Sequence, residues 1–246
     1  MQASNAVPAN DNAQETSPEP RAPRIGDLGG VWQRTLLIEP DGKIDRTSDV
    51  YWLQLGTLCA DIRSAPEPED RGSAKSCHSA FAGTLYARDG IFHWAPQWAY
   101  GLKEGAPPDE GLLRWEGAIL REDGVHAAYV EHWRRLATPS DDDFACWLTD
   151  GADNRKGVLL RIGRFAFCAN EADGTAEGTQ FRLFTRGEDG WGVAASTPGH
   201  GSTGATFTWP DVLRLSGVEC AEKASSTRMN DAAGSRLRRL KIEECI

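Results

Sequence analysis

The side chains that are candidates for proton transfer, Tyr129, Glu131 and His132, lie in one stretch, from Gly124 to Leu136. The stretch follows the Asp-Gly pair at 123–124, which is a strong local signal for a hairpin turn. In a strand, alternate residues share a face. One face then carries Val125, Ala127, Tyr129, Glu131, Trp133 and Arg135. The opposite face carries His126, Ala128, Val130, His132 and Arg134.

A carboxylate between two aromatic side chains suits the inside of a barrel that holds something polar. Glu131 would act as an acid or base if the aromatic surroundings raised its pKa. Tyr129 and His132 are the other catalytic candidates, although neighbouring strand residues face opposite ways, so His132 cannot share a surface with Glu131. The structural alternative is that Tyr129 and Trp133 fill a core while Glu131 pairs with Arg135. Both interpretations stay open at this point.

A second group of residues suggests ligand binding. Arg164 alternates with Leu160 and Ile162, so we expect it to point into an apolar face and to need a partner there. It could pair with Glu131, stack on Trp32, or bind a ligand carboxylate through two hydrogen bonds. Aromatic residues around Trp94 are typical of pockets for flat ligands, with core filling as the alternative. The predicted ligand-binding residues are Trp32, His93, Trp94, Trp115, Glu131, Trp133 and Arg164.

Several function classes are disfavoured by the composition and motifs. The net charge of −9 argues against nucleic acid or an anionic membrane as the main partner. No apolar run approaches the roughly 20 residues that span a bilayer. The run Gly199-His200-Gly201-Ser202 departs from the serine-hydrolase elbow, and there is no phosphate loop or dinucleotide motif. The five histidines lack metal-binding spacing, so we predict no metal and no cofactor.

The cysteines and the start of the chain lead to an expectation about location. None of the six cysteines is in C-x-x-C spacing, and the first residues lack the pattern of a secretion signal. We therefore expect reduced thiols in a cytoplasmic protein. Cys59 and Cys168 lie in apolar runs and are expected in the core.

The elements that would position these residues are short antiparallel strands. Asp-Gly pairs at 89–90 and 123–124 predict hairpin turns, and a third hairpin is predicted across 187–190. No long segment with a period of 3.6 residues is present, so we expect little helix. Single strands are expected over 50–62, 112–120 and 157–169, with further β structure over 206–215 and 237–246.

The chain is expected to form two barrels after a tail. Residues 1–26 contain few large apolar side chains and are predicted to be disordered. A proline and three successive aspartates at 138–143 mark a boundary. We therefore predict an N-terminal antiparallel β-barrel over 27–138 and a C-terminal one over 139–246.

Two resemblances support this arrangement. Gly30-Val31-Trp32 resembles the opening of lipocalins and other calycins, which implies that the tryptophan plugs one barrel end under an arginine from a late strand. The chain also resembles the fungal HRI family, named for interaction with a casein kinase, from about residue 79 to 190. That family implies two consecutive calycin-like barrels and supplies no catalytic residues. The residues that carry this resemblance are Phe81-Ala82-Gly83-Thr84, Trp94, Trp98, Glu131-x-Trp133, Ile162-Gly163-Arg164, Glu177-Gly178 and Phe181-Arg182-Leu183.

Three functional hypotheses follow. The first is a lipocalin-like protein that binds an apolar or aromatic small molecule, with or without a carboxylate. The second is a cofactor-independent lyase, isomerase or hydrolase that uses Glu131, Tyr129 or His132 in the same pocket. The third is a protein-interaction module with filled barrels. Filled barrels favour the third, an open apolar cavity without an acid–base pair favours the first, and a cavity with Glu131 within reach of a His or Tyr favours the second.

Overall fold

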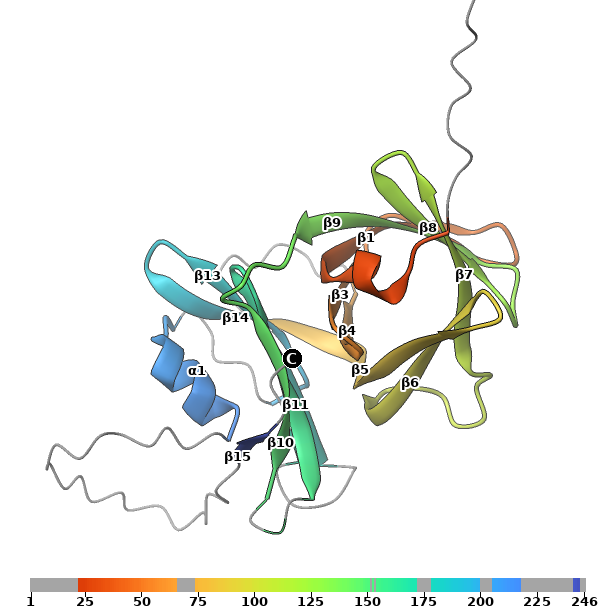
Figure 1. Cartoon of the computed structure of the whole chain (residues 1–246). Coiled ribbons are helices and arrows are strands. Elements are labelled where there is room, and N and C mark those ends of the chain that lie inside the picture. The colour runs from red at the N-terminus through yellow and green to blue at the C-terminus, as the bar shows by residue number, and fades with distance from the viewer. Residues whose placement is uncertain are drawn as a thin grey trace, which may run out of the picture.

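The computed structural model describes residues 22–65, 74–150, 152, 154–171, 178–199 and 205–217, and the backbone of 241–243. Within these residues the chain is mostly β-strand, with a short 3-10 helix, η1 (Ile25–Leu28), and one α-helix, α1 (Trp209–Leu215). This confirms an all-β fold with little helix (Figure 1). Neither of these helices is long and apolar enough to cross a membrane. Most of the predicted disordered tail lies outside the described residues, while η1 begins at Ile25, inside its predicted range.

The first half of the chain closes into an eight-stranded antiparallel barrel (Figure 1). Each strand pairs with the next along the chain, and the last strand pairs with the first. A two-residue strand, β2 (Ile44–Asp45), pairs with the end of the first strand. The barrel strands are β1 (Gly30–Ile38), β3 (Asp49–Leu55), β4 (Leu58–Ser64), β5 (Lys75–Arg88), β6 (Ile91–Tyr100), β7 (Asp109–Glu116), β8 (Ile119–Gly124) and β9 (Val130–Ala137).

The second half continues the same sheet as a second layer. Its strands are β10 (Phe144–Thr149), β11 (Arg155–Ile162), β12 (Phe165–Glu171), β13 (Thr179–Gly187) and β14 (Gly190–Ser196), with β15 (Lys241–Glu243) beside β10. β14 joins the barrel through a parallel pairing with the start of β5. The strands of the first half therefore form a closed barrel, whereas the described strands of the second half pair as an open sheet.

Two apolar clusters fix the second layer in place. One cluster lies between the barrel wall and the second layer, where Leu53 and Ile62 pack with Phe167 and Leu183. The other lies on the far side, where Val212 of α1 packs against the sheet. Cys59 and Cys168 are both buried, which confirms the core positions predicted for them.

The hairpin turns show where the sequence prediction was right and where it was wrong. Asp89 and Gly90 join β5 to β6 with φ angles of 54° and 81°, as a two-residue turn with both residues left-handed requires. The turn predicted at Asp123-Gly124 is wrong, because β8 continues to Gly124 and the chain turns over residues 125–129.

The three long strands predicted over 50–62, 112–120 and 157–169 are also wrong, since each is a hairpin. A glycine with positive φ is the first of two turn residues in every case, as in the II′ type. These turns are Gly56-Thr57, Gly117-Ala118 and Gly163-Arg164.

The β structure expected over 206–215 is replaced by α1. The Thr208 side chain accepts a hydrogen bond from the Asp211 backbone N–H, and the Asp211 carboxylate accepts one from the Thr208 N–H. This reciprocal cap, followed by Pro210 in the first turn, begins a helix locally. The predicted last strand over 237–246 is present at Lys241–Glu243.

Candidate functional site

A cavity of about 830 Å³ lies in the barrel, and all eight barrel strands contribute side chains to its lining. This volume falls within the range of pockets that hold drug-sized ligands. Below the cavity, η1 packs Leu28 into the barrel interior, where its carbonyl accepts a hydrogen bond of 2.8 Å from Trp32 Nε1. The barrel is therefore filled toward this end and hollow above it.

Tryptophans form the floor and part of the wall of the cavity. The Trp52 ring makes edge contacts with Trp94 and Trp133, each with ring centroids 5.7 Å apart. On its other side Trp52 stacks on Trp32 at 5.8 Å. Trp94 and Trp133 line the cavity, as predicted, whereas Trp32 and Trp115 pack together beneath it and are not lining residues. Tyr129, a predicted catalytic candidate, also lines the cavity, and the aromatic lining that sequence reasoning missed consists of Trp52, Phe81 and Tyr86.

The arginine that covers Trp32 is not the one expected from the sequence. Arg164 lies in the exposed turn between β11 and β12, with its guanidinium over Phe165. The prediction that it points into an apolar face was therefore wrong, because Gly163 turns the chain just before it. Arg135 of β9 lies 4.3 Å from the centroid of Trp32 and donates a hydrogen bond to the Asp27 carbonyl. The arginine over Trp32 is thus Arg135 and not Arg164.

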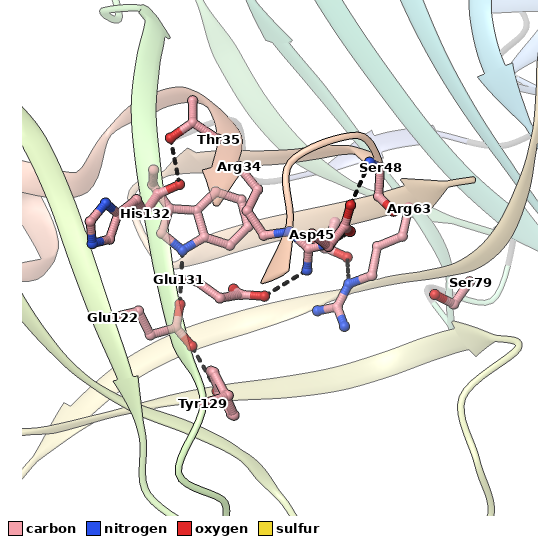
Figure 2. Close-up of polar contacts among 12 residues, drawn as sticks. Arg34, Thr35, Asp45, Ser48, Arg63, Ser79, Glu122, Tyr129, Glu131 and His132 are labelled. Carbon is pink, nitrogen blue, oxygen red and sulfur yellow. Dashed lines mark hydrogen bonds and ion pairs between the residues drawn. The ribbon is translucent and has the colours of Figure 1, made fainter. Parts of the chain in front are cut away.

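Glu131 is buried and its partner is Arg34 of β1 (Figure 2). Arg34 Nη1 donates to Glu131 Oε1 at 2.6 Å, and Nη2 contacts Asp45 at 3.2 Å. The pairing of Glu131 with Arg135 or Arg164 is therefore wrong. β1 and β9 are neighbours only because the barrel closes, so nothing local in the sequence indicates this contact.

A second arginine, Arg63 of β4, also projects among carboxylates of the cavity (Figure 2). Its Nε donates to Asp61 Oδ1 at 2.6 Å, and its Nη2 lies 3.5 Å from Asp109. Asp61 is only 2% exposed, so this ion pair is held in a largely dehydrated place. Sequence reasoning assigned no role to these residues.

Glu122 is the most notable residue that sequence reasoning missed. It lies opposite Glu131 on the neighbouring strand and is 3% exposed. Its two oxygens accept hydrogen bonds from the Tyr129 hydroxyl at 2.8 Å and from Trp133 Nε1 at 3.0 Å (Figure 2). Neither of these donors carries a positive charge.

Two glycines provide the space for this arrangement. A Cβ at Gly111 would lie 2.8 Å from Glu122 Cγ, and a Cβ at Gly124 would lie 2.2 Å from Tyr129 Cε1. Gly111 and Gly124 face each other across β7 and β8. The absence of both side chains therefore creates the niche in which Glu122 and Tyr129 meet.

The surroundings of Glu122 and Glu131 affect the pKa values of the two carboxyl groups differently. Burial raises the pKa of Glu122 well above its ordinary value of 4.5, and the charges of Glu131 and Asp109 raise it further. Burial also raises the pKa of Glu131, but the nearby Arg34 and Arg63 guanidinium groups act in the opposite direction. Glu122 is therefore the member of the pair that keeps its proton to higher pH, and Glu131, paired with Arg34, is the member that ionises first.

The histidines lie away from the floor of the barrel. His93 alternates with the inward Phe92 and Trp94, and its Nδ1 lies 2.8 Å from Glu110 Oε1 at the edge of the cavity. His126 contacts the other oxygen of Glu110 at 2.9 Å. These two hydrogen bonds lower the pKa of Glu110, that from His93 having the larger effect.

His132 is not a lining residue of the cavity, and its Nε2 lies 4.0 Å from Glu116 Oε2. It therefore cannot act there together with Glu131. Across the part of the chain that the structure describes, no group of three His, Cys, Asp or Glu side chains is arranged to hold a metal ion.

Fold and site together define an all-β protein whose closed eight-stranded barrel encloses an aromatic cavity with buried charges. No protein-family model matches the chain, and no curated protein matches it. A solved structure with a similar fold is that of the uncharacterized protein YLR301w from Saccharomyces cerevisiae. The two chains are 12% identical, with a TM-score of 0.51, over 88% of this chain and 98% of that one. At this identity the similarity shows a common fold and carries no information about activity.

Proposed function

We propose that the protein binds a small molecule with a flat aromatic body inside the N-terminal barrel, in the manner of lipocalins. The observation that carries the proposal is the cavity of about 830 Å³ above the tryptophan floor. Trp52, Trp94 and Trp133 offer ring faces and edges to a flat ligand, and the polar residues above them would fix its orientation. A barrel that served only as a scaffold would gain stability by filling this space.

The arrangement of polar groups favours binding over the catalytic alternative. Glu131 Oε1 is engaged by Arg34, and the Tyr129 hydroxyl is engaged by Glu122. The three catalytic candidates thus do not converge on one reacting position, since His132 lies outside the cavity lining. The interaction-module alternative requires a filled barrel, which the cavity disfavours.

A ligand screen with a blocked variant tests this proposal. Ligands that raise the melting temperature and change tryptophan fluorescence are selected from a library of aromatic compounds. A ligand at 100 times its dissociation constant adds about 2.7 kcal/mol, which is a rise of roughly 5–10 °C for a chain of this size.

The blocked variant is Ser79→Leu, because Ser79 is buried and lines the cavity. The matched control is Ser76→Leu, which makes the same change at an exposed position of the same strand. We expect Ser79→Leu to lose the ligand response and Ser76→Leu to keep it. Equal responses from both variants would place the binding site elsewhere.

We further propose membership of the HRI family and a cytoplasmic location. The spacing of the motifs from Phe81 to Leu183 supports the first proposal. The buried thiols of Cys59 and Cys168 support the second, because a reducing compartment keeps such thiols reduced. Localisation of a tagged full-length chain by fluorescence microscopy tests the second proposal.

A further inference from the structure

The charges in the cavity are not balanced. Four carboxyl groups line its interior, against two guanidinium groups, so carboxylates are in excess even while Glu122 keeps its proton. At the edge of the cavity, Glu39 and Glu110 add two acidic side chains and Lys103 adds one basic one, so the excess of acidic groups remains. His93 and His126 are already bonded to Glu110. The four carboxyl groups are those of Asp61, Asp109, Glu122 and Glu131, and the guanidinium groups are those of Arg34 and Arg63.

Both arginines are committed to carboxylates already present. Arg34 bridges Glu131 and Asp45, and Arg63 bridges Asp61 and Asp109. A ligand carboxylate would have to compete with these partners and would add a further negative charge. Glu122 has no cationic partner among the described residues, since it is bonded by Tyr129 and Trp133. A carboxyl group buried in an aromatic cavity without a counter-charge keeps its proton, and a cationic ligand would supply the charge that its ionised form lacks.

We propose that the ligand is an aromatic amine, whose protonated nitrogen is received between Glu122 and Asp109 while its ring rests on the tryptophan floor. This inference rests on the proposed binding function and names the chemical class of its ligand. Asp109 keeps a third of its side chain exposed, so it can meet the ammonium group before the buried Glu122 does. Trp94 and Trp133 add favourable cation–π contacts.

Binding of such a cation is coupled to loss of a proton from Glu122. The groups that face Glu122 are Tyr129 and Trp133, which donate to it, and Glu131 and Asp109, which repel its charged form. The positive groups act elsewhere, since Arg34 and Arg63 lower the pKa of Glu131 and Arg63 also that of Asp61. An ammonium group beside Glu122 supplies the missing counter-charge, so the carboxyl group ionises and its proton goes to the buffer.

The decisive experiment uses matched probes. Three aromatic bodies, phenyl, naphthyl and indol-3-yl, are each tested as the 2-ethylamine, the 2-ethanol and the 3-propionate, by calorimetry with the full chain. We expect at least one amine to bind ten-fold or more tightly than its alcohol and its propionate. We also expect the amine to release up to one proton, measured from the difference in binding heat between phosphate and Tris buffers.

Variants of Glu122 and Asp109 then test whether the preference for amines arises in the cavity. Glu122→Gln should remove both the amine preference over the alcohol and the proton release. Asp109→Asn, at a more exposed position, should weaken the amine preference in a protein that keeps its core. Glu104→Gln is the matched control, because Glu104 is exposed and is not a lining residue.

The outcomes separate this inference from the proposed function. Tighter binding of the alcohols or propionates overturns the amine proposal and leaves a binding cavity in place. An amine preference that survives both Glu122→Gln and Asp109→Asn also overturns it. Absence of binding by all nine probes, and by the wider aromatic library, counts against both.

Discussion

Replacement of Glu122 by glutamine should change how the stability of the protein depends on pH. Glutamine keeps the shape of a protonated glutamate and can still accept a hydrogen bond from Tyr129 or Trp133. It removes the ionisable group whose pKa burial raises well above 4.5. The two proteins should therefore resemble each other near pH 4.5 and diverge as the pH rises.

The sign and the slope follow from proton linkage. Between 4.5 and the raised pKa, Glu122 is protonated in the folded state and ionised in the unfolded state. The folded protein binds the extra proton, so its free energy of unfolding falls as the pH rises, by about 1.4 kcal/mol per pH unit for one proton. Glu122→Gln lacks this loss. For each pH unit within that window the variant should gain about 1.4 kcal/mol relative to the parent, or roughly 3–6 °C in melting temperature.

Urea unfolding followed by tryptophan fluorescence, at half-unit steps from pH 5 to pH 8, measures this difference. Glu104→Gln removes the same charge from an exposed position and should show a constant offset from the parent. If the difference between Glu122→Gln and the parent is also constant with pH, Glu122 is ionised in the folded state. The interpretation of its niche would then be wrong, together with the proton release proposed for ligand binding.

Three further substitutions test the packing of the site by the free energy of unfolding. Arg34→Met should cost about 3–5 kcal/mol, because it leaves Glu131 buried without its partner. The double variant Arg34→Met with Glu131→Leu should recover most of that loss, and a double variant no more stable than the single one refutes the ion pair. Gly124→Ala should cost about 1–3 kcal/mol, because the new Cβ displaces Tyr129. Gly192→Ala, with nothing within 4 Å of its new Cβ, should cost far less. Equal losses would contradict the claim that Gly124 makes room for Tyr129. Arg135→Leu should cost about 1–2 kcal/mol through the lost contact with Trp32, while Arg164→Leu, at an exposed turn, should have little effect. A larger loss of stability in Arg164→Leu than in Arg135→Leu would restore the role first predicted for Arg164.

The inward face of β9 could be predicted from the sequence because it depends on local alternation. Glu131 and Trp133 are buried on one face, with Arg135 over Trp32, as a period of two requires. The turn at Asp89-Gly90 was predictable for the same reason, because two adjacent residues suffice to define it.

The errors at three hairpins arose where the apolar pattern continues through a turn. Gly56, Gly117 and Gly163 each reverse the chain within a run that reads as one strand. The Gly-X signal of the II′ hairpin was present in all three and was outweighed by the run of apolar residues around it. Arg164 was misplaced as a direct result, since its predicted direction assumed that the strand continued past Gly163.

The partners of Glu131 and Trp32 could not be predicted, because they depend on how the barrel closes. β1 and β9 are separated by about a hundred residues, and their register places Trp32 opposite Arg135. Glu122 was missed for a related reason. The strand was predicted to end at residue 120, before a turn at 123–124, whereas the observed strand continues and Glu122 faces its cross-strand partner Glu131.

The polar interior is the feature that stability alone does not explain. Buried ion pairs replaced by apolar residues of similar size are often neutral or stabilising, so Arg34–Glu131 and Arg63–Asp61 are poor choices for a barrel that must only fold. The lower end of the same barrel shows the alternative, since Trp32, Leu113 and Leu120 fill it with apolar side chains. The chain thus packs one end for stability and keeps the other end hollow, charged and aromatic. A barrel divided in this way meets a requirement that lies outside folding, and binding a polar aromatic molecule is such a requirement.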